Sequence, residues 1–226
     1  MSEKVDFDKY TDNYNELLRE STGFFTSNED YFAEYKVRLT RKKVKHQVAR
    51  ILEYGCGIGR NIPYLQAMFP DAEVFGTDIS AASLELAAAE NRAATFAVET
   101  PELEIGQFDL IFIAGVFHHI APVERPAVCD LLSKRLVRSG TMTVFEHNPY
   151  NPITRSIVNT CPFDADAVLL RPSELAARFS QVNMSVVDRS FCLFVPPRLS
   201  SLVKLEDYFW WLPLGGQYCS VVRHAK

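Results

Sequence analysis

Paired cysteines, long apolar runs and an excess of charge of one sign are all missing from this chain. The five cysteines are scattered and never form a C-x-x-C pair. We therefore expect reduced, buried thiols in place of disulfides or a zinc site, and we assign no metal ligands. The formal net charge of −4 offers no general attraction to phosphate backbones, which argues against nucleic acid as a partner.

No stretch of the sequence is apolar for long enough to cross a bilayer, and the polar residues 1–6 lack the apolar core of a signal peptide. We therefore expect a cytoplasmic protein that makes no contact with membranes. Repeats, low-complexity tracts and glycine- or proline-rich linkers are missing too. The 226 residues are accordingly expected to form a single domain.

Short apolar segments alternate with helical ones from residue 50 onward. Such alternation is typical of a mainly parallel sheet with helices on both faces, and it favours a doubly wound α/β fold. Before residue 50 we expect two helices, near 8–20 and 28–47. The last two strands are expected to pair antiparallel at one end of the sheet. The predicted strands are 50–54, 73–77, 95–98, 108–114, 141–146, 182–195 and 217–223.

The segment LEYGCGIGR, residues 52–60, places three glycines at the turn from the first strand to the next helix. Glycines at such a turn let the backbone approach a ligand, and the helix start directs free N–H groups at it. Dinucleotide-binding folds use G-x-G-x-x-G here to hold a pyrophosphate, whereas this chain has G-x-G-x-G. Glu53, before the glycines, would repel a pyrophosphate and attract an ammonium group. The loop therefore predicts a ligand with a positive charge.

Asp78 ends the second strand roughly 20 residues beyond the glycines, where an acid typically accepts hydrogen bonds from ribose hydroxyls. Its other reading is a cap for the helix that starts near Ala81, a role that Ser80 could fill instead. A ribose at one end and a cation at the other describe S-adenosylmethionine. With Glu53, the glycine loop and Asp78, the chain resembles the class I S-adenosylmethionine-dependent methyltransferases.

The resemblance implies a Rossmann-like seven-stranded sheet with its last strand antiparallel. It also implies a helical lid of residues 1–48 ahead of a core of residues 49–226. In such enzymes the glycine loop and its acid approach the amino-acid end of the cofactor. Adenine packs on the residue after the ribose acid, here Ile79, and Glu99 stands where the family often has an aspartate. The cofactor-binding residues implied in this way are Tyr14, Glu53, Gly55, Cys56, Gly57, Asp78, Ile79, Glu99 and Gly115.

Methyl transfer is an in-line displacement, and the reacting groups of an open parallel sheet gather at the carboxyl ends of its strands. After the fourth strand, residues 115–120 resemble the "HHI" segment of the small-molecule type 11 and type 12 methyltransferases. One histidine facing the acceptor and one capping or packing on the next helix are both open readings. The fifth strand ends in a Glu-His-Asn cluster that suits recognition or base catalysis, with turn formation as the competitor for the asparagines. We predict catalytic roles for His118, His119, Glu146 and His147, and acceptor contacts for Tyr10, Phe117, Asn148 and Trp210.

The leading hypothesis is methyl transfer to a small molecule, at oxygen or nitrogen in preference to carbon. A loose resemblance of residues 145–172 to a bacterial subgroup suggests a specialised or surface-polysaccharide pathway. Two alternatives stay open, a nicotinamide-dependent oxidoreductase on the same sheet and a protein that binds S-adenosylmethionine without turnover. The aromatic run of residues 208–211 leaves open a homodimer.

Overall fold

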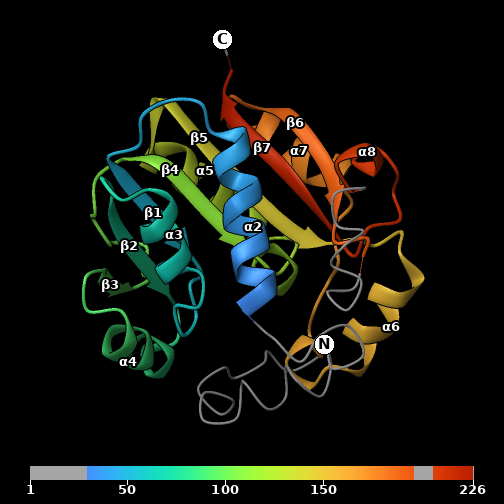
Figure 1. Cartoon of the computed structure of the whole chain (residues 1–226), viewed down its shortest axis with the longest axis horizontal. Helices are drawn as coiled ribbons and strands as arrows, with labels where there is room; N and C mark the ends of the chain where they lie inside the picture. Colours follow the sequence, from blue (N-terminus) through green and yellow to red (C-terminus); the bar gives the residue numbers. More distant parts are fainter. Residues whose placement is uncertain (1–29, 196–205, 226) are drawn as a thin grey trace.

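The computed structural model describes residues 30–195 and 206–225, which form a seven-stranded sheet with helices on both faces (Figure 1). The strand order is β3-β2-β1-β4-β5-β7-β6. The strands are β1 (Arg50–Tyr54), β2 (Glu73–Asp78), β3 (Thr95–Val98), β4 (Phe108–Ala114), β5 (Leu136–His147), β6 (Met184–Cys192) and β7 (Gln217–His224).

The strands β3, β2, β1, β4 and β5, which are neighbours in this order, run parallel to one another. Strand β7 runs antiparallel to both β5 and β6. The predicted doubly wound sheet with an antiparallel last strand is confirmed. The prediction for β5 was too short at its start, because Leu136 already pairs with Phe108 before an irregularity in the register.

Seven helices and two short 3-10 helices connect or flank the described strands. The predicted helix near 28–47 is observed as a shorter helix, because the chain leaves helical geometry after Lys43 to reach β1. The predicted helix near 8–20 lies outside the described residues, and the division into residues 1–48 and 49–226 stays a prediction. The helices are α2 (Asp30–Lys43), α3 (Ile62–Met68), α4 (Ala81–Glu90), α5 (Arg125–Arg135), α6 (Pro152–Thr160), α7 (Pro172–Ser180), α8 (Glu206–Phe209), η2 (Phe117–His119) and η3 (Pro162–Asp164).

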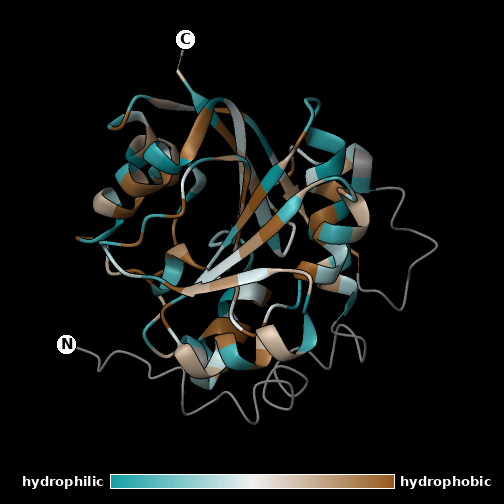
Figure 2. Ribbon diagram, turned by 90° about the vertical axis from the view of Figure 1, so that its left-hand side faces the viewer, coloured by the Kyte–Doolittle hydropathy of each residue, from teal (hydrophilic) through white to brown (hydrophobic). Residues whose placement is uncertain are grey.

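Alternating side chains of the central strands contribute to two separate cores. In Figure 2 the ribbon of the sheet contains many hydrophobic residues, drawn in brown. Ile111 of β4 packs with α5 and α7 on one face, whereas Leu110 packs with α2 and α3 on the other. A strand turns successive side chains to opposite faces, so a run that is apolar throughout must be covered on both sides. This is why the sequence of β4 shows no polar alternation.

The carboxyl ends of the parallel strands meet at one edge of the sheet, and α2 lies across the face beside α3 (Figure 1). Thr40 of α2 donates a hydrogen bond to the Thr143 hydroxyl of β5 over 3.2 Å, which ties the helix to the middle of the sheet. The loops after β1, β2, β4 and β5 are thereby brought to the same edge. In the part of the chain that the structure describes, no helix is long and apolar enough to cross a membrane.

Candidate active site

The glycine loop after β1 has a backbone that other residues would strain. Gly55 and Gly57 have φ values of +70° and +52°. A Cβ at Gly55 would lie 2.5 Å from Cγ2 of Val116, so the loop packs directly on the turn after β4. A Cβ at Gly57 would meet no heavy atom within 4 Å. The loop is closed toward the protein at Gly55 and open at Gly57, as a ligand-facing backbone requires.

Asp78 links the tips of β1 and β2. The Gly57 N–H donates to one of its carboxylate oxygens over 2.7 Å, and the Ser80 N–H donates to the other over 3.0 Å. The cap of α4 belongs to Ser80, whose hydroxyl accepts from the Ser83 N–H over 3.0 Å. Asp78 is therefore not needed as a cap. The following residue, Ile79, is 58% exposed, which leaves an apolar side chain at the position predicted to pack on adenine.

Glu53 is buried below the loop with half of its carboxylate unsatisfied. Asn61 donates to Oε1 over 2.5 Å, and Oε2 has no hydrogen-bond partner among the described residues. Burial raises the pKa of Glu53 to about 8, against the lowering effects of Asn61 and of Lys36. An ammonium group beside Oε2 would supply the missing donor and stabilise the ionised form. The residues present thus fit the amino-acid end of S-adenosylmethionine.

Lys36 of α2 interacts electrostatically with the site, although nothing in its sequence context singled it out. Burial lowers its pKa, and Glu53, Cys192, Arg60 and Glu146 are the charged or titratable groups that act on it. In the sequence it is one of several basic residues in an amphipathic helix. Only the packing of α2 across the sheet brings it to the strand tips.

Two residues that were predicted to hold the cofactor, Cys56 and Glu99, have other partners in the structure. The Cys56 side chain is buried, and its Sγ lies 2.8 Å from the position of a Cβ on Gly76, so it fills the space behind the loop. Both carboxylate oxygens of Glu99 accept from the Arg135 guanidinium, over 2.8 and 2.9 Å. Cys56 therefore offers the ligand backbone only, and Glu99 is held in a bidentate ion pair.

The turn after β4 is built around the buried carboxylate of Glu146 on β5. Its Oε1 accepts from the Val116 and Phe117 N–H groups over 3.0 and 2.8 Å, and its Oε2 lies 2.6 Å from Nδ1 of His118. Gly115 joins the same turn, where its N–H donates to the Phe145 carbonyl over 2.8 Å. These contacts direct the Glu146 carboxylate at the turn and at His118, and its predicted catalytic role stays a prediction.

Three histidines and two aspartates form a compact cluster next to this turn, which we call the histidine cluster: His118, His119, His147, Asp164 and Asp166. The His118 ring centroid lies 4.1 Å from that of His119 and 4.8 Å from that of His147. Asp164 Oδ1 is 3.6 Å from His118 Nε2 and 3.4 Å from His119 Nε2. Nδ1 of His119 is 3.3 Å from Asp166 Oδ1. The structure thus brings together all three predicted histidines.

The three histidines of the cluster have different pKa values because their electrostatic surroundings differ. Burial disfavours the charge on His118, but Glu146 and Asp164 outweigh it and raise the pKa of His118 to about 9. Burial and then the charge of His118 lower the pKa of His147 to about 4, and they lower that of His119 as well. Burial would raise the pKa of Glu146, but His118 holds it below its usual range. The cluster therefore combines a charged His118 and two neutral imidazoles with ionised carboxylates.

Asp164 and Asp166 are the functional candidates that sequence reasoning missed. They stand in CPFDADAVLL, inside the segment 145–172 whose loose resemblance pointed to a subgroup and to no single residue. The segment is fixed to η2 because the Val168 N–H donates to the His118 carbonyl over 2.8 Å. The buried Arg125 guanidinium adds bonds to the Ile120 and Val168 carbonyls, over 2.9 and 2.6 Å.

The structure gives other surroundings to three residues that were predicted to contact the acceptor. Phe117 is fully buried in the core, with its ring 5.8 Å from that of Phe179, because η2 turns it inward; its prediction was wrong. Asn148 is also fully buried, and its amide donates to the Pro213 and Gly215 carbonyls, so it holds a loop together. Trp210 is 54% exposed beyond α8. Tyr10 and Tyr14 lie outside the described residues.

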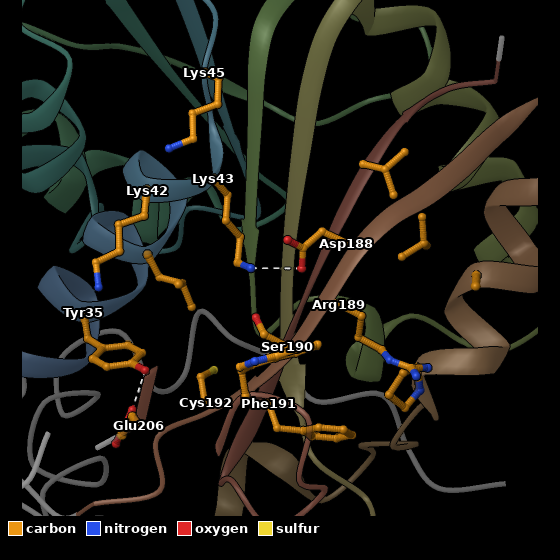
Figure 3. Close-up of a pocket in the computed structure, with 16 residues that line it drawn as sticks. Tyr35, Lys42, Lys43, Lys45, Asp188, Arg189, Ser190, Phe191, Cys192 and Glu206 are labelled. Carbon is orange, nitrogen blue, oxygen red and sulfur yellow. Dashed lines mark hydrogen bonds and ion pairs between the residues drawn. The ribbon is translucent and has the colours of Figure 1, made fainter. Parts of the chain in front are cut away.

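A second groove lies beside α2, between that helix and β6 (Figure 3). Lys43 pairs with Asp188 across it over 3.0 Å, and the Tyr35 hydroxyl donates to Glu206. Trp210 borders this groove. Its lining includes no residue of the glycine loop or of the histidine cluster, so we assign the site to the strand tips.

Comparisons with known proteins agree with this geometry. Residues 52–142 match the family model of a methyltransferase domain. An uncharacterized protein of Synechococcus sp. is 31% identical over 105 residues, a match that covers 42% of this chain and 25% of that protein. The chain thus spans about a quarter of the length of the curated relative it matches.

Two solved structures are similar over nearly the whole chain. One is a TehB-like S-adenosylmethionine-dependent methyltransferase from Corynebacterium glutamicum, with 17% identity and a TM-score of 0.67, covering 96% of this chain and 98% of that one. The other is the mitomycin 7-O-methyltransferase, with 12% identity and a TM-score of 0.67, covering 98% of this chain and 61% of that one.

The chain therefore has the fold of the class I S-adenosylmethionine-dependent methyltransferases, and residues 52–142 carry the methyltransferase domain. The cofactor of this class is S-adenosylmethionine. The fold is as predicted from the sequence.

Proposed function

We propose that this chain transfers the methyl group of S-adenosylmethionine to a small molecule held at the histidine cluster. S-adenosylmethionine supplies an electrophilic methyl group on a positively charged sulfur. The roles of this chain's residues are to hold that cofactor on one side and the acceptor on the other. In-line displacement depends mainly on such positioning.

One observation carries the proposal: a continuous chain of contacts joins the two halves of the site. Gly55 of the open loop packs on Val116, the Val116 N–H is bound by Glu146, and Glu146 holds His118. The cofactor half and the acceptor half therefore share one turn. A ligand on the glycine loop and an acceptor at the cluster would approach each other across it.

The chemistry of the cluster supports an acceptor that attacks through oxygen or nitrogen. Ring nitrogens and carboxylates can accept hydrogen bonds from a hydroxyl or an amine and so orient it toward the methyl group. The solved methyltransferase whose name places its acceptor at an oxygen of mitomycin gives a parallel on the same fold. The formal charge of −4 favours a small molecule over nucleic acid, and five free, buried thiols suit a reducing compartment such as the cytoplasm.

Calorimetry with S-adenosylmethionine and its demethylated product, S-adenosylhomocysteine, tests the cofactor half. We expect both to bind, and we expect Asp78→Ala to weaken binding by about 1.5–3 kcal/mol through loss of hydrogen bonds to a charged group. Asp71→Ala is the matched control, because Asp71 is exposed and precedes β2 at the opposite edge of the sheet. No affinity for either compound would overturn the proposal.

Transfer itself requires a separate assay. The chain is incubated with cell extract and methyl-labelled S-adenosylmethionine, and the label is followed into small molecules, protein and nucleic acid. We expect it in the small-molecule fraction. Tight cofactor binding without transfer would favour the non-catalytic reading, and label in protein or nucleic acid would refute the acceptor class.

A further inference from the structure

We propose that His118, His147 and Asp164 form a binding site for one divalent first-row transition-metal ion, with Zn²⁺ as the best match. Each residue offers one ligand atom, and these atoms all lie within 4.8 Å of one another. The three come from separate segments, η2, the end of β5 and η3. The sequence analysis assigned no metal ligands because it considered the cysteines. The ligands proposed here are histidines and an aspartate that lie far apart in the sequence.

The spacing fits a metal better than a direct contact between the side chains. Nε2 of His118 and Oδ1 of Asp164 are 3.6 Å apart, which is too long for a hydrogen bond. Two ligands bound tetrahedrally at about 2.1 Å lie about 3.4 Å from each other. An ion between these two atoms would need only a small closure of the side chains, and a larger closure would bring together all three ligand atoms, which lie within 4.8 Å of one another.

His118 is already held as a metal ligand would be. The ionised Glu146 carboxylate only accepts hydrogen bonds, so Nδ1 of His118 carries the proton that faces it over 2.6 Å. Nε2, on the Asp164 side, is then left with its lone pair when the ring is neutral. A carboxylate behind the ligating histidine fixes its tautomer and orientation, and Glu146 is itself anchored by two backbone N–H groups.

The other two ligands are also set in place. Among the described residues, the His147 ring has no hydrogen-bond partner, and its contact is with the ring of His118. Asp164 stands on a segment that is fixed through Val168 to the His118 carbonyl and to Arg125. Neither ligand depends on a flexible surface position.

The donor set selects the kind of ion. Two imidazoles and one carboxylate suit Zn²⁺ and other first-row transition ions, whereas Mg²⁺ and Ca²⁺ prefer oxygen ligands. Three protein ligands leave at least one position open, as catalytic zinc sites do. Resting on the proposed function, we assign that position to an acceptor hydroxyl, whose proton a metal ion makes easier to remove. Metal binding itself does not depend on that role.

The test is titration of the chelator-treated, tag-free full chain with Zn²⁺, followed by calorimetry, with Co²⁺ absorption as the probe of coordination. We expect one Zn²⁺ per chain and intense visible bands with Co²⁺. Asp164→Asn and His147→Gln should each lower Zn²⁺ affinity at least tenfold. Glu146→Gln, which alters the group behind His118, should lower it by about 10–100-fold.

His46→Gln and Asp71→Asn are the matched controls, because both residues lie away from the cluster, and they should keep the wild-type stoichiometry and affinity. Far-UV circular dichroism and S-adenosylhomocysteine affinity show whether each variant is folded. No stoichiometric Zn²⁺ in the wild-type chain, or equal affinity in folded Asp164→Asn and His147→Gln, would overturn the proposal. Zn²⁺ binding without any cofactor binding would instead overturn the proposed function and leave the metal site standing.

Discussion

At the tips of β1 and β2 the site is made mostly of backbone, whereas at the tips of β4 and β5 it is made of side chains. The half that we propose binds the cofactor contains two glycines with positive φ and an acid that accepts a hydrogen bond from the loop N–H. The half that we propose binds the acceptor contains histidines and carboxylates from three separate segments. The first half is thus set by local conformation and the second by how distant segments pack.

The largest effect is expected from Arg125, which should stabilise the acceptor half alone. Arg125→Ala removes a buried guanidinium from the Ile120 and Val168 carbonyls and should lower the free energy of unfolding by about 3–5 kcal/mol. Urea unfolding measures the loss, with exposed Arg92→Ala as the control. In the folded fraction, Zn²⁺ affinity should fall while S-adenosylhomocysteine affinity stays. A loss of both would mean that the two halves are not separable.

Substitution of the two loop glycines, Gly55 and Gly57, should lower the free energy of unfolding by different amounts in urea unfolding. Gly55→Ala places a Cβ in a left-handed conformation and against Val116, which should cost about 2–4 kcal/mol of unfolding free energy. Gly57→Ala has the conformational cost alone, about 1 kcal/mol, because its Cβ meets open space. In calorimetry, Gly57→Ala should nevertheless weaken the cofactor strongly. Equal stability of the two variants would contradict the packing of the loop on the turn after β4.

Glu53 should make cofactor binding depend on pH. Its pKa of about 8 means that the free chain holds it protonated at pH 6–7, whereas an ammonium ligand requires the carboxylate. Binding then releases a proton, so affinity should rise up to about tenfold from pH 6 to pH 7. Glu53→Gln should remove this slope and the proton release seen in buffers of different ionisation enthalpy. A wild-type affinity that does not change with pH would show that Glu53 does not face the ammonium.

The smallest expected effect is that of Ser80→Ala, which should change stability, whereas a change at Asp78 should change cofactor affinity. Ser80→Ala removes the cap of α4 and should lower the free energy of unfolding by about 1 kcal/mol, with cofactor affinity nearly unchanged. Asp78→Asn should do the reverse and act mainly on affinity. The two variants are compared by urea unfolding and by calorimetry. If Ser80→Ala weakens the cofactor as much as Asp78→Asn, helix α4 and the ribose contact are coupled.

Much of the fold could be predicted because its signals are local. The strands β1, β3 and β4 have the predicted bounds, since each contains a short, mainly apolar run. The open loop at Gly57 and its contact with Asp78 have local signals too, because the glycines and the acids stand at strand ends; their role in holding the cofactor stays a prediction. Glu99 departs from its prediction because it meets Arg135, which lies 36 positions further along the chain.

The acceptor half could be predicted only in part. The segment with His118 and His119 carried a resemblance that pointed to the site, whereas the resemblance of residues 145–172 did not single out Asp164 and none covered Lys36. Phe117 shows the limit clearly, because an aromatic residue beside two histidines suits a pocket wall and a core equally well. Its burial was decided by the inward turn of η2 toward Phe179.

The sequence by itself determined the alternating fold, the open loop at Gly57 and the acid at Asp78, because each depends on neighbours along the chain. The tertiary structure decided that Glu53 keeps one oxygen without a partner, that Lys36 reaches the strand tips and that Asp164 meets His118 and His147. These contacts join segments far apart in sequence, and only the packing of the helices and loops around the sheet fixes their distances.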